Sequence, residues 1–338
     1  MSTKGNILIT GGAGFIGSHL TDYLLAKQYK VTVLDNFANG KKENLLDAEK
    51  NPNFRCIEGD ILDKDTCQNS LKDVDYVFHL ACLGVRHSIH SPFENHRVNA
   101  EGTLNVLEAS KQHNIKHFFY ISTSEVYGRT HTFPIEENAP TLPLTVYGAS
   151  KLAGEHYAHA FYECYQLPIT VLRIFNNYGE RAHYEGDAGE LIPRSIIKIL
   201  YHETPVIFGD GSITRDFFYV KDTAKALHNM LEISQKSPEN ILNQTFNIGT
   251  GIEYSIKTMV EKLLQLMQKE ALGIQYQTDR VADVPRLWVN ADKFKKISHF
   301  QADYDLETGL QNTIQYYTEK VKNADNLLQE VKLFNWEK

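Results

Sequence analysis

The 338-residue sequence has few cysteines, no long apolar run and no excess of basic residues, and each of these absences argues against a class of protein. It has only four cysteines, Cys56, Cys67, Cys82 and Cys164, and their spacing is not that of a metal site. No apolar run approaches membrane-spanning length, and the N-terminal residues are too short and polar to form a signal peptide. The formal net charge is −7, without the basic excess that a nucleic-acid partner requires. We therefore expect a cytoplasmic protein with reduced thiols, no metal, no membrane and no nucleic-acid partner.

Apolar segments with strand-like and helix-like patterns alternate through the first half of the chain. Strands are expected at residues 6–10, 30–35, 54–60, 75–81 and 117–122, and helices at 15–28 and 95–112. This alternation predicts a Rossmann-type α/β fold, in which helices cover both faces of a doubly wound parallel sheet. Ligands of such sheets bind beyond the carboxyl ends of the strands.

The second half has shorter elements and is expected to form a smaller substrate-binding lobe. Residues 1–175 would form the first domain and residues 176–338 mainly the lobe, with some segments returning to the first domain. Residues 182–200 join a polar loop to a helix, and the loop carries three acids, Glu185, Asp187 and Glu190. This loop either closes over a substrate or is simply solvated. Residues 323–338 are expected to form a tail helix with no assigned role.

The turn after the first expected strand is rich in glycine. Residues 10–17 read TGGAGFIG, a G-x-G-x-x-G spacing preceded by one more glycine: Gly11, Gly12, Gly14 and Gly17. Such glycines let the backbone approach a pyrophosphate, and the helix that follows adds amide donors. Asp35 ends the second strand, where a carboxylate bonds the ribose of an adenosine and repels a 2′-phosphate. NAD is therefore favoured over NADP, although Lys41 and Lys42 lie nearby; the alternative is a plain tight turn.

Residues 121–128 read ISTSEVYG and end the expected strand at 117–122. A turn accounts for Ser122, Thr123 and Ser124, because hydroxyl side chains bond nearby backbone groups. It does not require Glu125, which is a helix-starting residue, a surface charge or a proton-transfer group.

Tyr147 and Lys151 are four residues apart, so they share one face of a helix. The free pKa of tyrosine is about 10, and a nearby ammonium lowers it by stabilising the phenolate. Such a pair can remove a hydroxyl proton while a hydride leaves the same carbon. The spacing alone is weak evidence, and it gains weight from the glycine turn and the hydroxyl cluster.

Together these segments resemble the extended short-chain dehydrogenase/reductase family, specifically its NAD-dependent nucleotide-sugar epimerases and dehydratases. The resemblance extends from about residue 5 to about residue 318. It rests on the segments TGGAGFIGSHL, DNFANG, STSEVYG, YGASK, RIFNNYG, IFGDGSITRDFFYVKD and RVADVPR. These segments are specific for the family and much less specific for the substrate.

The resemblance implies that NAD is the cofactor. The residues that would hold it are Gly11, Gly14, Phe15, Ile16, Gly17, Asp35, Asn36, Asp60, Ile61, Leu80, Ala81, Asn99, Ser122, Tyr147 and Lys151. The three glycines would hold the pyrophosphate, while Asp60 and Ile61 would flank the adenine. Leu80, Ala81 and Asn99 would line the cofactor channel, although Asn99 could instead satisfy helix-end backbone groups.

The resemblance also implies a nucleotide-diphosphate sugar as substrate. Its expected contacts are Arg86, Asn176, Ile192, Phe208, Arg215 and Arg280. Arg215 and Arg280 would clamp the diphosphate, a task suited to guanidinium groups, and Phe208 would lie near the nucleobase. The alternatives are a turn at Asn176, a surface ion pair at Arg215, a loop role for Arg86 and a core position for Phe208.

The implied chemistry begins with oxidation of the sugar at C4, with Tyr147 as base and Thr123 sharing a hydrogen bond with the sugar hydroxyl. Glu125 would then remove the C5 proton, as in a 4,6-dehydratase, which is the first expectation. Many such enzymes have Asp where Ser124 stands, which keeps a 4-epimerase as second choice and a uronate decarboxylase as third. A distant alternative is a non-catalytic NAD-sensing protein; it would not need both Tyr147 and Lys151, and their presence argues against it.

A homodimer is expected through a four-helix bundle, because family members often pair in this way. The helices would be residues 99–112 and 147–165, which carry apolar side chains at Val106, Leu107, Leu152, Tyr157 and Phe161. The alternative is that these side chains only pack on the sheet.

Overall fold

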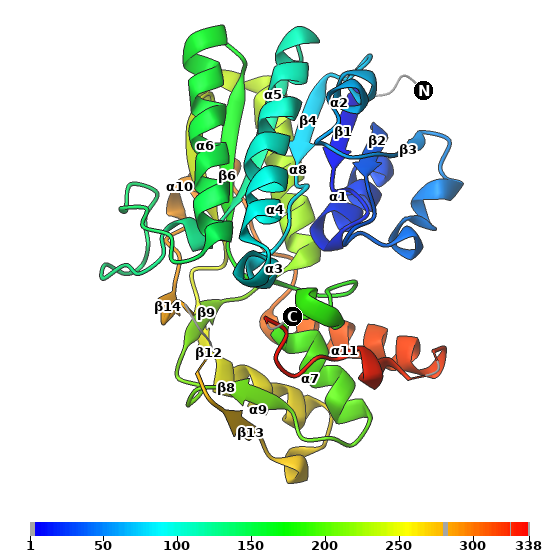
Figure 1. Cartoon of the computed structure of the whole chain (residues 1–338), viewed down its shortest axis with the longest axis vertical. Helices are drawn as coiled ribbons and strands as arrows, with labels where there is room; N and C mark the ends of the chain where they lie inside the picture. The colour runs from blue at the N-terminus through cyan, green and yellow to red at the C-terminus, as the bar shows by residue number, and fades with distance from the viewer. Residues whose placement is uncertain (1–3, 280–282, 325, 337–338) are drawn as a thin grey trace.

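The computed structural model describes residues 4–279, 283–324 and 326–336 (Figure 1). Figure 1 shows a larger upper lobe with long helices and a smaller lower lobe, with a waist between them. No helix within the described residues is both long and apolar enough to cross a membrane. The expected contact of Arg280 with substrate lies outside the described residues.

The upper lobe is built on a seven-stranded sheet in which every neighbouring pair is parallel. The strand order is β11-β6-β5-β4-β1-β2-β3. The strands are β1 (Asn6–Thr10), β2 (Lys30–Asp35), β3 (Phe54–Glu58), β4 (Tyr76–His79), β5 (His117–Thr123), β6 (Ile169–Ile174) and β11 (Gln244–Ile248). Helices on both faces bury the central strands completely, which explains their continuous apolar runs. The predicted α/β class is confirmed.

Two sets of helices form the layers above and below the sheet. One hydrophobic cluster joins the sheet to α1 (Phe15–Ala26), α8 (Val220–Lys236) and α10 (Asp292–Ser298). The other joins it to α2 (Lys64–Ser70), α5 (Gly102–Gln112) and α6 (Val146–Tyr165). α8, β11 and α10 return to the upper lobe from the second half of the sequence.

The expected helix at residues 95–112 begins earlier and is not uniform. α3 (Val85–His90) and α4 (Pro92–His96) precede a π-helical turn (Arg97–Glu101) that leads into α5. Pro92 occupies the first turn of α4, where its missing N–H costs no hydrogen bond. The π turn brings Asn99 against the loop that follows β4.

The lower lobe has its own apolar core and small sheets. Its helices are α7 (Leu191–Leu200), α9 (Ile256–Leu266) and α11 (Leu306–Lys322). Its strands are β7 (Asn177–Tyr178), β8 (Val206–Phe208), β9 (Thr214–Asp216), β10 (Phe218–Tyr219), β12 (Glu253–Ser255), β13 (Gln275–Gln277) and β14 (Arg286–Leu287). Short 3-10 turns are η1 (Lys42–Leu45), η2 (Ala48–Lys50), η4 (Ser124–Val126), η5 (Gly186–Ala188), η6 (Pro238–Asn240), η7 (Glu270–Leu272) and η8 (Leu327–Glu330).

The expectation of a tail helix at residues 323–338 is wrong for the described part of that segment. α11 continues to Lys322, and one short 3-10 turn, Leu327–Glu330, follows it. After this turn the chain is extended at Val331 and packs against the lower lobe. The apolar side chains of the tail meet different partners along its length, so they do not need one continuous helical face.

Candidate functional site

A cavity of about 1030 Å³ lies at the carboxyl ends of β1, β2, β4 and β5, where the two lobes meet. Upper-lobe residues from the glycine turn, Asp35 and α6 line it together with lower-lobe residues such as Arg215 and Asp283. A smaller cavity of about 100 Å³ shares part of this wall and extends towards Ile192 and Phe208. One continuous cleft therefore brings most of the expected site residues together.

The glycine turn forms a cradle that side chains would fill. Gly11 has φ of 72°, and a Cβ on it would lie 2.7 Å from the Ala81 nitrogen. A Cβ on Gly17 would collide with the Gly11 carbonyl oxygen. Gly14 precedes α1 directly, so the first amides of that helix face the cavity side of the turn. The cradle fits the pyrophosphate of a dinucleotide.

Asp35 lies at the end of β2 with its carboxylate fixed by the backbone. Its Oδ2 accepts a hydrogen bond from the Ala13 amide at 2.9 Å, and its Oδ1 accepts one from the Phe37 amide at 2.9 Å. Burial raises the pKa of Asp35, and the two amide hydrogen bonds oppose this rise. Asn36 donates to Asp60 at 3.0 Å, which holds the loops after β2 and β3 together beside the cavity.

Tyr147 and Lys151 both line the cavity from the first turns of α6. Burial raises the pKa of Tyr147 well above its usual value; Cys82 adds to the rise, and a hydrogen bond with Thr123 opposes it. Burial lowers the pKa of Lys151, whose Nζ stands 4.4 Å from the centre of the Tyr120 ring. The expected lowering of the Tyr147 pKa by Lys151 is therefore absent in the chain by itself, because desolvation of the phenol dominates.

Glu125 follows the end of β5 within the short turn Ser124–Val126. Thr123 caps this turn, since its hydroxyl accepts a hydrogen bond from the Glu125 amide at 3.2 Å. The Glu125 side chain is half-buried and lines the cavity together with Tyr147. Burial raises the pKa of Glu125, and the charge of Arg215 opposes the rise. Glu125 is thus neither a solvated surface charge nor the capping residue, which is Thr123.

The other two hydroxyls of the ISTSEVYG segment differ in their surroundings. Ser122 donates a hydrogen bond to Glu155, which forms a buried ion pair with Arg173 at 2.7 Å. Ser124 is buried and lines the cavity, as does Ser122. Ser122 therefore ties the end of β5 to α6, whereas Ser124 stands beside Glu125.

Two arginines in the cleft are paired with acids. Arg86 on α3 contacts Glu190 at 3.2 Å, and Arg215 on β9 contacts Asp283 at 2.6 Å. Within the described part of the chain, the buried Arg86 Nε has no hydrogen-bond partner, and the same holds for the buried Asn176 Oδ1. Both residues line the two cavities, so these atoms are suited to contact a ligand.

Asn99 does not line the cavity, which corrects the expectation for this residue. Its Oδ1 accepts a hydrogen bond from the Leu83 amide at 2.8 Å, and its Nδ2 donates to the Leu83 carbonyl at 3.0 Å and to Ser150 at 3.1 Å. The side chain is fully used in shaping the loop after β4. Asn99 therefore supports the wall of the cavity from behind.

Sequence reasoning missed the acidic partners of the site. Asp283 and Glu190 belong to segments that the sequence had already marked, RVADVPR and the acidic loop. Their pairing with Arg215 and Arg86 spans 68 and 104 residues. Only the folded chain could reveal these partners.

Comparison with known proteins gives consistent matches over most of the chain. The family model described as GDP-mannose 4,6 dehydratase matches residues 8–313. A putative UDP-glucose 4-epimerase of Methanocaldococcus jannaschii is 37% identical over 317 residues, which are 92% of this chain and 97% of that protein.

Two solved structures represent different reactions on this fold. The UDP-N-acetylglucosamine 4-epimerase of Methanobrevibacter ruminantium M1 has a TM-score of 0.87 and 35% identity, covering 94% of this chain and all (100%) of that one. The dTDP-glucose 4,6-dehydratase DesIV of Streptomyces venezuelae, solved with NAD bound, has a TM-score of 0.88 and 27% identity, covering 95% of this chain and 99% of that one.

Proposed function

We propose that this chain, which belongs to the NAD-dependent nucleotide-sugar epimerase and dehydratase family of extended short-chain dehydrogenases/reductases, is a nucleotide-sugar 4,6-dehydratase. One observation carries the proposal. The Glu125 carboxyl lies in the wall of the cleft beside Tyr147, and burial raises its pKa above the ordinary value of a glutamate. A carboxyl in such an environment is suited to taking up and releasing a proton.

The residues of the upper lobe fit NAD. Gly11, Gly14 and Gly17 leave room for the pyrophosphate, and Asp35 would face the adenosine ribose with the repulsion against a 2′-phosphate noted above. When bound, NAD would supply a hydride acceptor for C4 of the sugar and a hydride donor for C6, and its positive charge would favour the phenolate of the tyrosine.

Tyr147 would take the proton of the sugar C4 hydroxyl, with Thr123 hydrogen-bonded to the same phenol. Lys151 would hold the nicotinamide ribose and supply a positive charge on the same face of α6. Because burial alone keeps Tyr147 neutral, these charges must offset desolvation before the phenolate can form. The diphosphate would lie between the two lobes, where Arg215 faces the cleft.

Glu125 would act after the C4 ketone has made the C5 hydrogen acidic. Its carboxylate takes the C5 proton and passes it to the C6 hydroxyl, which leaves as water. Once hydride has reached C6, C5 regains a proton that Glu125 has taken up from solvent, and Tyr147 releases the proton of the C4 hydroxyl. A raised pKa suits both halves of this exchange, because the group must first accept the proton and then release it. The neighbouring position is Ser124, so no second carboxyl stands there to protonate the leaving group, and Glu125 must serve for both.

A UDP-sugar 4-epimerase is the second candidate, and the Methanocaldococcus jannaschii relative favours it. Such an enzyme turns the 4-ketone over and returns the hydride to C4. Tyr147 and Lys151 suffice for this reaction, and the C5 hydrogen never leaves. Glu125 would then only shape the cleft.

Product mass distinguishes the candidates directly. The purified protein is incubated with UDP-, dTDP- and GDP-sugars and the products are analysed by mass spectrometry. Dehydration removes about 18 mass units, decarboxylation about 44, and epimerisation none, as the reaction classes require. Unchanged mass with conversion to the C4 epimer would replace the dehydratase assignment.

Glu125→Gln tests the role of the carboxyl, since it keeps the size and removes the proton-accepting group. We expect turnover to fall on the order of a hundredfold or more, the range for losing a general base. Sugar oxidised at C4 should accumulate, and solvent deuterium should enter C5 much more slowly than in the unaltered enzyme. Tyr147→Phe is the matched control, because it should block the reaction before any 4-ketone forms. Near-normal turnover of Glu125→Gln would assign Glu125 a structural role.

A further inference from the structure

The last described residues, 331–336, form a tail that is anchored firmly to the lower lobe. Arg194 on α7 donates hydrogen bonds to the carbonyls of Lys332 and Leu333, at 2.5 and 2.9 Å. Asn335 is fully buried and donates to the Gly189 carbonyl at 2.9 Å. The tail thus accepts hydrogen bonds from a buried arginine and donates one to a buried carbonyl, and these bonds fix the path of the segment. The tail therefore has a defined place in the fold.

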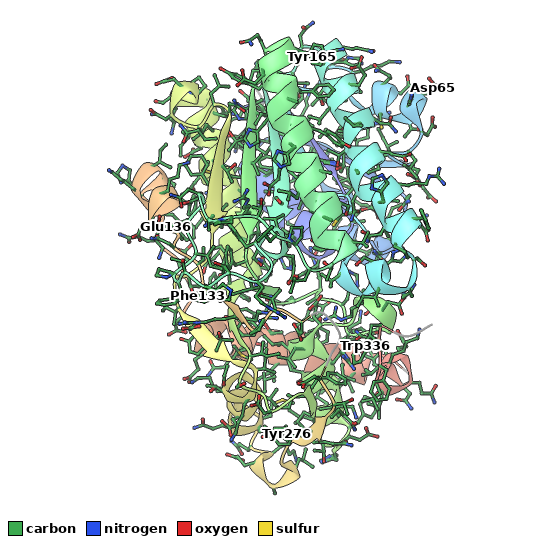
Figure 2. The ribbon with its side chains drawn as sticks, turned by 60° about the vertical axis from the view of Figure 1, so that its left-hand side comes forward. Asp65, Phe133, Glu136, Tyr165, Tyr276 and Trp336 are labelled. Carbon is green, nitrogen blue, oxygen red and sulfur yellow. The ribbon has the colours of Figure 1, made fainter. Side chains whose placement is uncertain are left out.

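The tail ends on an aromatic cluster at the waist between the lobes. The Trp336 ring lies edge-on to Phe208, with 4.7 Å between ring centres and an angle of 79°. Phe334 completes the group at 6.0 Å from Phe208, and Ile89 of α3 packs against it from the upper lobe. Figure 2 labels Trp336 above Tyr276, towards the upper lobe.

Phe208 connects this cluster to the cleft. It lines the smaller cavity together with Arg215 and Asn176, and Ile89 lines the larger one. β8, which carries Phe208, pairs only with β13 in a two-stranded sheet among the described strands. So small a sheet holds a ring weakly by itself, and Trp336 supplies packing against the ring.

The loop that holds the tail is also part of the cleft wall. Three acids of this loop pair with bases of the upper lobe: Glu185 with Lys41 at 2.9 Å, Asp187 with His90 at 2.6 Å, and Glu190 with Arg86 at 3.2 Å. On its other side, Asp187 contacts Lys332 of the tail at 3.2 Å. The acidic loop thus spans the cleft, and the tail supports it from behind.

We propose that Trp336 is a positioning residue for the nucleobase of the substrate, acting through Phe208. This proposal rests on the proposed function, because it requires a nucleoside diphosphate in the cleft. The base would contact Phe208 beyond the diphosphate-binding Arg215, and the indole would fix the orientation of the Phe208 ring. A tail that merely covers apolar surface would instead affect folding without affecting base recognition.

The test compares Trp336→Ala with the unaltered protein by calorimetric titration of UDP, dTDP, GDP and inorganic pyrophosphate. We expect the nucleoside diphosphates that bind to lose several-fold to roughly tenfold in affinity, the effect of losing one aromatic pair. KM for the nucleotide sugar should rise by the same factor, with kcat at saturation, NAD affinity and pyrophosphate affinity unchanged. Trp336→Phe should restore most of the loss.

Tyr276→Ala is the matched control, because Tyr276 belongs to the same two-stranded sheet, is exposed, and does not line either cavity. It should leave every one of these constants unchanged. If Trp336→Ala does not fold, Trp336→Leu keeps apolar volume without the ring and makes the same comparison.

Four outcomes would overturn the inference. Equal nucleoside-diphosphate affinity in Trp336→Ala and the unaltered protein would leave Trp336 no role in base binding. If Trp336→Ala binds pyrophosphate and the nucleoside diphosphates more weakly by the same factor, the effect lies at the diphosphate site and not at the base. If Trp336→Ala binds the nucleoside diphosphates more tightly, the tail hinders binding. If the unaltered protein binds none of the nucleoside diphosphates, the proposed function fails and the inference fails with it.

Discussion

Asp35 lies where we propose that a single carboxylate selects NAD over NADP. Both of its oxygens already accept backbone amides, so its position beside the cavity is fixed before any ligand arrives. Each oxygen retains acceptor capacity for a ribose hydroxyl. Its charge would oppose a 2′-phosphate at the same place. Lys41, which could have favoured that phosphate, is paired with Glu185 across the cleft.

Asp35→Asn should therefore narrow the preference for NAD over NADP. The amide keeps an acceptor oxygen for the turn but loses the charge that repels the phosphate. We expect the ratio of the two dissociation constants to fall roughly tenfold or more, as for hydrogen bonds to charged groups. Titration of both dinucleotides by fluorescence measures the ratio. Tighter binding of NADP by the unaltered protein would contradict the assignment.

For individual residues, the sequence predicted which side chains line the site better than it predicted their hydrogen-bond and ion-pair partners. The cavity is lined by the predicted glycines, by Asp35 and by Tyr147, because short-range pattern and strand order determine where these residues lie. The prediction that Asn99 lines the cofactor channel was wrong, because Asn99 lies in the π turn and its side-chain amide bonds the backbone of Leu83. The raised pKa of Tyr147 was also missed, because burial depends on how both lobes close over the phenol.

The helices α5 and α6, which were expected to form a four-helix bundle between two subunits, differ in what they expose. Val106 and Leu107 are fully buried against the sheet, so they cannot contact a second subunit. The outer face of α6 is different: exposed side chains recur at Val146, Ala149, His156, Ala160 and Cys164. Successive positions lie three, seven, four and four residues apart, which places them on one stripe of the helix.

This stripe leads us to predict that the homodimer forms mainly through α6. Ala160→Glu should then shift the protein towards monomers, because a charge would be buried against the partner helix. Light scattering coupled to gel filtration gives the mass. Lys236→Glu, on the exposed end of α8, is the control and should leave the mass unchanged. A monomer mass for the unaltered protein at working concentration would contradict the prediction.

The tail shows why an element can be misassigned from its pattern. A helix was expected here, yet Leu327 packs in the lower-lobe core while Trp336 packs with Phe208. An extended segment can reach both places, whereas a helix of the same length would be less than half as long. Tertiary contacts that the sequence does not display decided the conformation.

At the scale of the whole molecule, two buried histidines of the central sheet make the stability of the fold depend on pH. His79 on β4 bridges Thr10 and Thr103 at 2.7 and 2.9 Å, and His117 on β5 bonds Thr170 at 2.8 Å. Both rings are completely buried. Burial lowers the pKa of each to about 3. Folding therefore holds two imidazoles neutral at pH values where free histidine is protonated.

The stability of the protein should consequently fall as the pH falls below about 6.5, the pKa of histidine in an unfolded chain. Above that value both states are neutral at these positions, so the full stability is present. Below it the unfolded chain binds protons that the folded chain excludes, down to the folded pKa of about 3. Each histidine should remove about 1.4 kcal/mol of unfolding free energy per pH unit within this window.

His117→Gln isolates one of these contributions, because glutamine can still bond Thr170 but does not titrate. Urea unfolding of both proteins between pH 7 and pH 5.5 gives the slope of unfolding free energy against pH. The upper part of the window is chosen because burial raises the pKa of Asp216 and of Asp222, whose uptake of protons stabilises the folded state at lower pH. Unfolded His117 is only partly protonated between pH 7 and pH 5.5, so the variant should show an average slope smaller by about 0.8 kcal/mol per pH unit. Identical slopes would mean that His117 is protonated in the folded chain.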